Sequence, residues 1–182
     1  MMKNILFLHA GAEMYGADKV MLDLIKRLDK NKYNSLVILP TNGVLVDALK
    51  KENINVVVMP YPIMRRKFFN PKGMIQYAFG MVKYTNKITR IAKQHHIDLI
   101  HTNTAATLEG SFVSKRLHIP QLWSIHEIIV SPQIMYNVTS NLIAKYSSIT
   151  ITDSKVVKEH LDASGYFKEN AVKVIYNGVD SN

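Results

Sequence analysis

The sequence predicts an α/β fold, a Rossmann-like doubly wound parallel sheet of about seven strands with helices on both faces. Short apolar runs alternate with stretches of helical period along the whole chain, which indicates parallel strands joined by right-handed crossovers. The 182 residues, 47% hydrophobic and 20% charged, suit one globular domain with its own core. No internal repeat or low-complexity tract interrupts the alternation.

Each strand is predicted from a short apolar run, often β-branched, that stops at a turn or at polar residues. The second run stops at Pro40, for example, and an Asn42-Gly43 turn follows it. The predicted strands are Lys3–His9, Asn34–Leu39, Asn55–Met59, Ile97–Thr102, Gln121–His126, Ser148–Thr152 and Val172–Tyr176.

Each helix is predicted from apolar residues that recur at every third or fourth position. The predicted helices are Ala17–Lys30, Val44–Glu52, Lys72–His95, Ala105–Leu117, Pro132–Tyr146 and one capped by Asp153 or Ser154 that runs to about Asp162. The loop Pro60–Pro71 contains three prolines, which forbid a continuous helix there. In the longest helix, we expect one face to be buried: Met74, Ala78, Met81, Ile88 and Ala92.

The positive charge of the chain is concentrated in one segment. The net charge is +9, from 23 basic and 14 acidic residues, and Arg65–His96 alone holds eight basic residues and no acid. This predicts a docking surface for an anionic partner. We favour an anionic membrane over a merely solvated helix face, and over nucleic acid because no nucleic-acid-binding motif accompanies the charge. The predicted docking residues are Arg65, Arg66, Lys67, Lys83, Lys87 and Arg90.

The composition also bears on the compartment and on the chemistry. The chain has no cysteine, which excludes disulfides, thiolate zinc sites and cysteine nucleophiles, and fits a reducing compartment. No apolar run reaches the ~20 residues that a membrane span needs. We therefore expect a cytoplasmic protein, which would be peripheral on the inner face of the membrane if the basic segment docks there.

Ligands of such sheets bind beyond the carboxyl ends of the strands, so the first strand-to-helix loop is a candidate phosphate site. Gly16 is followed by Ala17-Asp18 instead of Lys-Ser/Thr, and the chain has no Gly-x-Gly-x-x-Gly, which argues against the standard ATP and NAD sites. Two interpretations of Gly16 remain: it lets a phosphate or a substrate hydroxyl approach the backbone, or it only shapes the turn.

Three histidines, His9, His101 and His126, each end a predicted strand. A three-histidine zinc site is possible in principle, but no carboxylate ligand accompanies them, and we expect no metal. We favour a polar substrate site, with His126 as the best candidate because Glu127 and a loop follow it. The chain contains no Asp-x-Asp pair and no Gly-x-Ser-x-Gly elbow, which argues against a carboxylate-bound metal–diphosphate and a serine hydrolase.

Taken together, these residues resemble the N-terminal half of a glycosyltransferase family 4 enzyme, which has the two-domain GT-B architecture. Tyr15–Val20 is similar to the family's Gly-Gly-x-Glu-Arg-Val, Asp98–Asn103 to its Asp-hydrophobic-hydrophobic-His strand, and Ser124–Glu127 to its Thr-x-His-Asp/Glu. Thr152–Ser154 carries its strand-end serine, and Val174–Asp180 is similar to Val-Ile-Pro-Asn-Gly-Val-Asp. The five motifs occur in order over nearly the whole chain.

The resemblance implies a retaining glycosyltransferase that moves a sugar from a nucleotide diphosphate sugar to a glycan acceptor, lipid-linked or not. It implies no cofactor and no metal. Gly16 and Ala17 would lie near the donor phosphate, and His126 would be a catalytic residue beside the reacting sugar. The residues implied on the acceptor side are His101, Thr102, Asn103, Glu127 and Ser154.

The sequence also departs from the family pattern. Tyr15 replaces the first glycine, which makes the loop bulkier, and Tyr176 replaces the proline. Family members continue into a second domain with a Glu-x7-Glu motif and basic residues that grip the diphosphate. We therefore expect residues 1–176 to form the acceptor-side domain and residues 177–182 to begin a linker. The donor-binding domain would be missing, and these 182 residues would be inactive alone.

Two other functions stay open. One is a non-catalytic, Rossmann-like binding or regulatory domain of the flavodoxin type, although only Glu13 lies where a receiver-like domain would cluster acids. The other is half of a nucleotide-sugar epimerase, which would need acids or bases placed for proton abstraction.

Overall fold

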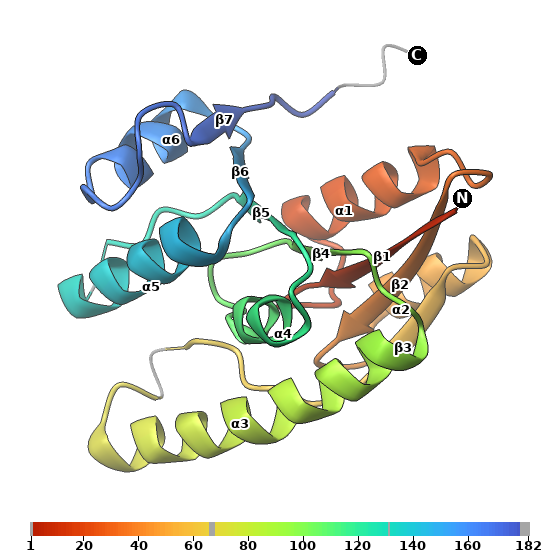
Figure 1. The fold of residues 1–182 in the computed structure, drawn as a ribbon, viewed down its shortest axis with the longest axis horizontal. Helices are drawn as coiled ribbons and strands as arrows, with labels where there is room; N and C mark the ends of the chain where they lie inside the picture. The colour runs from red at the N-terminus through yellow and green to blue at the C-terminus, as the bar shows by residue number, and fades with distance from the viewer. Residues whose placement is uncertain (1, 66–67, 131, 179–182) are drawn as a thin grey trace.

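Seven parallel strands lie side by side in the order β3-β2-β1-β4-β5-β6-β7 (Figure 1). The computed structural model describes residues 2–65, 68–130 and 132–178. The strands are β1 (Lys3–Leu8), β2 (Tyr33–Leu39), β3 (Asn55–Val58), β4 (Leu99–Thr102), β5 (Gln121–Ile125), β6 (Ile149–Thr152) and β7 (Val172–Val174). Each neighbouring pair is parallel, which confirms the predicted sheet.

The order of the strands places the switch point of the sheet between β1 and β4. The chain begins in β1, moves outward through β2 to β3, crosses back to β4, and then moves outward in the other direction. Phe7 of β1 pairs with His101 of β4 at this junction. Loops that leave the carboxyl ends of β1 and β4 therefore meet at the edge where doubly wound sheets bind ligands.

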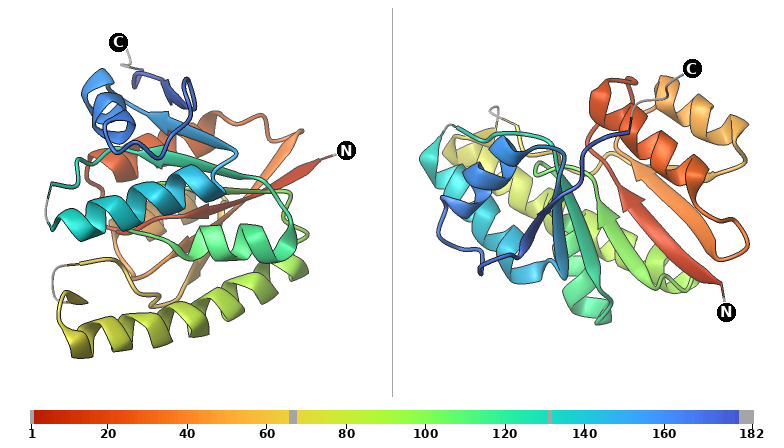
Figure 2. Two further views of the ribbon diagram at one scale, coloured as in Figure 1. Left: turned by 60° about the vertical axis from the view of Figure 1, so that its left-hand side comes forward. Right: turned by 90° about the horizontal axis from the view of Figure 1, so that it is seen from above.

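The helices cover both faces of the sheet (Figure 2). They are α1 (Gly16–Arg27), α2 (Val44–Lys51), α3 (Pro71–Gln94), α4 (Glu109–Leu117), α5 (Gln133–Tyr146) and α6 (Lys155–Asp162). Met21 of α1 and Leu45 of α2 pack with Phe7 on one face. Ile88 of α3 and Val113 of α4 pack under β1, β2 and β4 on the other face, where α5 and α6 continue the layer.

Helix α4 begins four residues later than predicted. The prediction started it at Ala105, but side chains bind the backbone amides of this segment: Glu127 accepts from Ala105, and the Thr104 hydroxyl accepts from Ala106. These contacts hold residues 105–108 as a loop, so the helix starts at Glu109. The periodicity of apolar residues cannot reveal that side chains bind backbone amides in place of helical hydrogen bonds.

The predicted buried face of α3 is correct only for its second half. Met81, Ile88 and Ala92 are buried, whereas Met74 is 46% exposed and Ala78 is also exposed. The first turns of α3 therefore carry apolar side chains that the sheet does not cover.

Within the described residues, no helix is long and apolar enough to cross a membrane.

Candidate functional site

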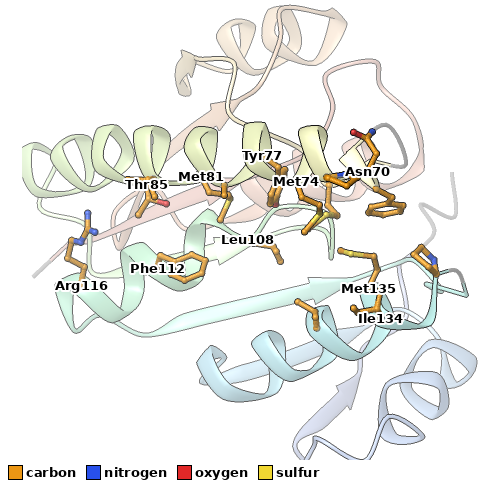
Figure 3. Close-up of a pocket in the computed structure, with 17 residues that line it drawn as sticks. Asn70, Met74, Tyr77, Met81, Thr85, Leu108, Phe112, Arg116, Ile134 and Met135 are labelled. Atoms are coloured by element: carbon orange, nitrogen blue, oxygen red, sulfur yellow. The ribbon is translucent and has the colours of Figure 1, made fainter.

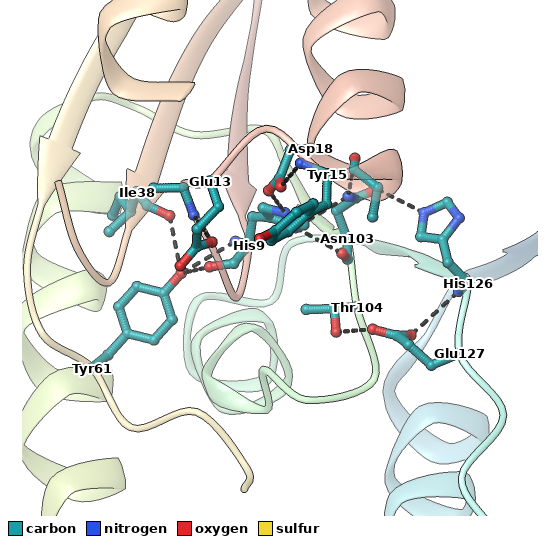
Figure 4. Close-up of polar contacts among 12 residues, drawn as sticks. His9, Glu13, Tyr15, Asp18, Ile38, Tyr61, Asn103, Thr104, His126 and Glu127 are labelled. Atoms are coloured by element: carbon teal, nitrogen blue, oxygen red, sulfur yellow. Dashed lines mark hydrogen bonds and ion pairs between the residues drawn. The ribbon is translucent and has the colours of Figure 1, made fainter. Parts of the chain in front are cut away.

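Polar side chains from neighbouring strands meet at the carboxyl edge of the sheet (Figure 4). His9 follows β1, Asn103 follows β4 and His126 follows β5. His9 Nδ1 lies 2.9 Å from the carbonyl oxygen of Asn103, and His126 Nε2 lies 3.2 Å from Asn103 Oδ1. Asn103 thus connects two histidines that are far apart in the sequence.

His126 is held from both sides of its ring. In addition to the Asn103 contact, His126 Nδ1 lies 3.0 Å from Asp153 Oδ2, at the end of β6. Both ring nitrogens face oxygen acceptors, so the imidazole has one fixed orientation. Its side chain keeps 12% of its surface exposed. The structure therefore presents a preorganised histidine at the edge of the sheet.

His9 is anchored by Asp18 in the first turn of α1. His9 Nε2 and Asp18 Oδ1 are 2.5 Å apart, both side chains are buried, and Asp18 Oδ2 accepts from the backbone N–H of Tyr15 at 2.6 Å. Burial raises the pKa of Asp18, but the hydrogen bond and charge of His9 and the backbone amides of Tyr15 and Met14 outweigh it, so this pKa is lowered. Asp18 therefore ties the start of α1 to the strand-end residues.

The loop before α1 leaves open space at Gly16. Gly16 and Ala17 are the first two residues of the helix, where backbone N–H groups have no partner within the helix. Apart from its chain neighbours and its own helix backbone, a Cβ added to Gly16 would meet no heavy atom within 4 Å, and the φ angle of Gly16 is not in the left-handed region. The strained residue of the turn is instead Met14, with φ of 77°. Neither packing nor backbone conformation therefore requires glycine at position 16.

The N-terminus of α1 lies next to the strand-end residues. Asn103 Nδ2 donates to the carbonyl oxygen of Ala17 at 3.3 Å. Through Asn103, the predicted donor-side residues Gly16 and Ala17 are thus connected to His126.

Glu127 binds the loop between β4 and α4, next to His126. Its carboxylate accepts from the Thr104 hydroxyl, and from the backbone N–H groups of Ala105 and His126 at 3.3 Å each. The indole of Trp123 donates to the carbonyl oxygen of Thr104 at 2.7 Å. Glu127 therefore fixes the loop between β4 and α4 beside His126.

Three of the predicted acceptor-side residues use their side chains within the fold. His101 is buried, and its Nε2 lies 2.8 Å from Ser124 Oγ; burial, then the charges of His126 and His9, lower its pKa to about 3. Thr102 is buried and accepts from Gln121, and Ser154 caps α6. Asn103, which is also buried, and Glu127 bond within the fold as well, but both lie beside His126.

The structure does not gather the three histidines as a metal site. In residues 2–65, 68–130 and 132–178, no group of three histidine, aspartate or glutamate side chains is arranged to hold a metal ion. His101 lies within β4 and bonds Ser124. His9 and His126 instead bind opposite sides of Asn103.

The predicted docking residues lie along the helix and the loop before it. Lys83, Lys87 and Arg90 are exposed on α3, and Arg65 is exposed before it. The ammonium groups of Lys83 and Lys87 each lie 5.4 Å from the centre of the Tyr84 ring. Arg66 and Lys67, the other predicted docking residues, and residues 179–182 of the linker lie outside the described residues.

Comparison with known protein families matches residues 14–182 to Glycosyltransferase Family 4. The chain belongs to this family. The match covers all five motifs completely, so it confirms the resemblance drawn from them. A comparison with curated proteins finds no match.

Solved structures confirm the fold of this family 4 chain. HepE from Anabaena in complex with UDP has a TM-score of 0.77 and 26% identity over 98% of this chain and 45% of HepE. A glycosyltransferase from Rickettsia africae ESF-5 has a TM-score of 0.75 and 21% identity, over 98% of this chain and 44% of its own. The UDP-GlcNAc 2-epimerase from Neisseria meningitidis, bound to UDP-GlcNAc, shares the fold at 14% identity and a TM-score of 0.62, over 94% of this chain and 45% of the epimerase. The chain thus spans less than half the length of these proteins.

Three polar residues at this edge make contacts that the sequence did not reveal. The sequence placed Thr104 in a loop expected on the acceptor side and Asp153 directly after a strand, without assigning a contact to either, and Asp18 only within a motif. A signal existed for Asp153, because it directly follows a strand whose neighbour ends at His126. No comparable signal pointed to Asp18, because its contact with His9 depends on how α1 packs on the sheet.

Proposed function

We propose that this chain is the acceptor-side half of a glycosyltransferase that moves a sugar from a nucleotide diphosphate sugar to a glycan acceptor. The supporting observation is that Asn103 joins His126 to the open N-terminus of α1. One small region thereby offers backbone N–H groups for an anion and a fixed imidazole for the sugar. HepE, which is similar to this chain, was solved with UDP, with UDP and glucose, and with UDP-glucose.

The chemistry of sugar transfer explains why two domains would be needed, one for the sugar and one for the diphosphate. In the transition state, negative charge develops on the departing diphosphate and must be stabilised by cations. The sugar resembles an oxocarbenium ion at that point and needs a preorganised polar environment. His126, oriented by Asn103 and Asp153, supplies part of the second requirement. A second domain would supply the cations for the first, so we propose that residues 1–182 are inactive alone. We also propose that the sugar is transferred with retention of its configuration and that the site uses no metal or cofactor. Both parts of the proposal rest on the family resemblance.

The basic segment extends the proposal to the location of the enzyme. Lys83, Lys87 and Arg90 are exposed on one helix that has no acid, which favours docking to an anionic surface. A membrane is favoured over nucleic acid because no nucleic-acid-binding motif accompanies the charge. The enzyme would then work in the cytoplasm, on the inner face of the membrane.

The proposal is tested by UDP release from a panel of UDP-sugars by the full-length protein, with acceptor extracts present. We expect His126→Ala to lower kcat/KM at least about 100-fold, because it removes a preorganised group beside the reacting sugar. His95→Ala, an exposed histidine at the end of α3, is the matched control and should keep full activity.

Three results would count against parts of this proposal. Full activity of His126→Ala would remove its role at the reacting sugar. Turnover by residues 1–182 alone would contradict the need for a second domain. Conversion of one UDP-sugar into another without an acceptor would indicate a nucleotide-sugar epimerase instead.

A further inference from the structure

A groove of about 1120 Å³ lies between α3 on one side and α4 and the start of α5 on the other (Figure 3). Its lining is mostly apolar and includes the methionines Met64, Met74, Met81 and Met135. Its polar members are Asn70, Tyr77, Thr85 and Arg116. Methionine side chains are flexible and polarisable, so they adapt to apolar ligands of variable shape. The volume is slightly above the ~300–1,000 Å³ that is usual for small-molecule pockets, so the groove has room for a long ligand.

The groove continues towards the strand-end site. A second cavity of about 320 Å³ shares Met64, Phe69 and Met135 with the groove, and is also lined by Arg65 and Glu127. Glu127 is the residue that binds the backbone of His126. The second cavity therefore adjoins the apolar groove and has both a cation and Glu127, the neighbour of His126, in its lining.

The helix that forms one wall of the groove also carries an exposed apolar stripe. Ile75, Phe79 and Val82 follow one another at helical spacing, and all three are exposed. The exposed cations Lys83 and Lys87 lie on the same helix. Apolar and cationic side chains on one helix are typical of a surface that contacts an anionic membrane.

We propose that the groove binds the hydrocarbon chain of a polyprenyl-phosphate-linked sugar acceptor. The chain would lie in the groove, the phosphate at Arg65, and the sugar at Glu127 beside His126. This inference rests on the proposed function, because it treats the polar end of the lipid as the acceptor. A lipid phosphate is favoured over a protein segment, since the mostly apolar groove adjoins a cavity that is lined by the cation Arg65 and by Glu127, next to His126.

The test is a calorimetric titration of the chain with geranyl, farnesyl and geranylgeranyl monophosphate below their micellar concentrations, without nucleotide sugar. We expect the affinity to rise at least about tenfold for each added isoprene unit, because each buries several more carbons. Farnesol and inorganic phosphate, the two halves of the probe, should each bind at least about tenfold more weakly than farnesyl phosphate. Because no donor is present, a failure here is distinct from a failure of the proposed sugar transfer.

Matched variants locate the binding. Val82→Asp and Ile134→Asp place a charge on opposite walls of the groove, at side chains that are 63% and 67% exposed, so both variants should fold. Each should weaken farnesyl phosphate binding at least about tenfold. Ile75→Asp, on the same helix, 59% exposed and outside the lining, should leave it unchanged. Arg65→Gln should weaken farnesyl phosphate but not farnesol.

Two outcomes would overturn the inference. One is an affinity that does not depend on chain length, or that falls equally in Val82→Asp and Ile75→Asp. The other is binding by residues 1–182 that is lost in the full-length protein, which would show that another segment of the protein covers the groove.

Discussion

Glu109 is a buried carboxyl group that the proposed site does not use. It is the first residue of α4 and is fully buried. Burial raises its pKa to about 8 from the usual 4.5, although the backbone amides of Glu109 and Leu108 oppose the rise. The folded protein therefore holds this group in its neutral form near neutral pH.

We predict that Glu109→Gln removes a pH dependence of stability. Because the folded-state pKa is raised, the contribution of Glu109 is fully present below pH 4.5 and falls as the pH rises towards about 8. The glutamine variant should match the wild type near pH 4.5 and exceed its free energy of unfolding by on the order of 3 kcal/mol at pH 8. Urea unfolding across this range measures it, with the exposed Glu169→Gln as control. Equal pH profiles for wild type and Glu109→Gln would contradict the assignment.

At the residue scale, the sequence indicated where the polar side chains lie in the sheet better than it indicated which groups they contact. Asn103, His126 and Glu127 lie together, because residues after parallel strands meet at one edge, and Asn103 also contacts Ala17, the neighbour of Gly16. His101 differs because it lies within β4, one residue before the end of the strand, and faces the interior. The neutral state of Glu109 could not be foreseen, since it depends on packing between distant segments.

At the scale of elements, Ser154 connects a predicted site residue to the stability of α6. Its Oγ accepts from the backbone N–H of Val157 at 3.3 Å. We predict that Ser154→Ala lowers the free energy of unfolding by about 1 kcal/mol, because it leaves that group unpaired, whereas Ser154→Asp keeps the cap. Urea unfolding of the three proteins decides this. Equal stability of the alanine variant and the wild type would mean that the cap contributes nothing.

The elements themselves were predictable, and their ends less so. All seven strands and six helices occur where apolar periodicity placed them. The start of α4 differs because Glu127 and Thr104 bind the preceding amides. The exposed first half of α3 differs because periodicity identifies an apolar face but not what covers it, and Met74 faces a groove instead of the sheet.

At the scale of the whole molecule, the parallel sheet gathers the candidate site at one edge. The adjacent strands β1, β4, β5 and β6 supply His9, Asn103, His126 and Asp153 to a single network. The chain spans less than half the length of HepE and of the Rickettsia glycosyltransferase, and in the proposed function this edge would be one wall of a cleft.

The central claim is that the open space at Gly16 is where the nucleotide sugar approaches this wall. The most direct measurement compares Gly16→Ala with the wild type in the full-length protein, by Tm and by kcat/KM for the UDP-sugar. Apart from its chain neighbours and its own helix backbone, the added methyl group would meet no atom within 4 Å, so we predict an unchanged or slightly raised Tm. We also predict a fall in kcat/KM of at least about tenfold, because the methyl group would occupy space that the substrate needs. An unchanged kcat/KM, or a loss of Tm, would contradict the claim.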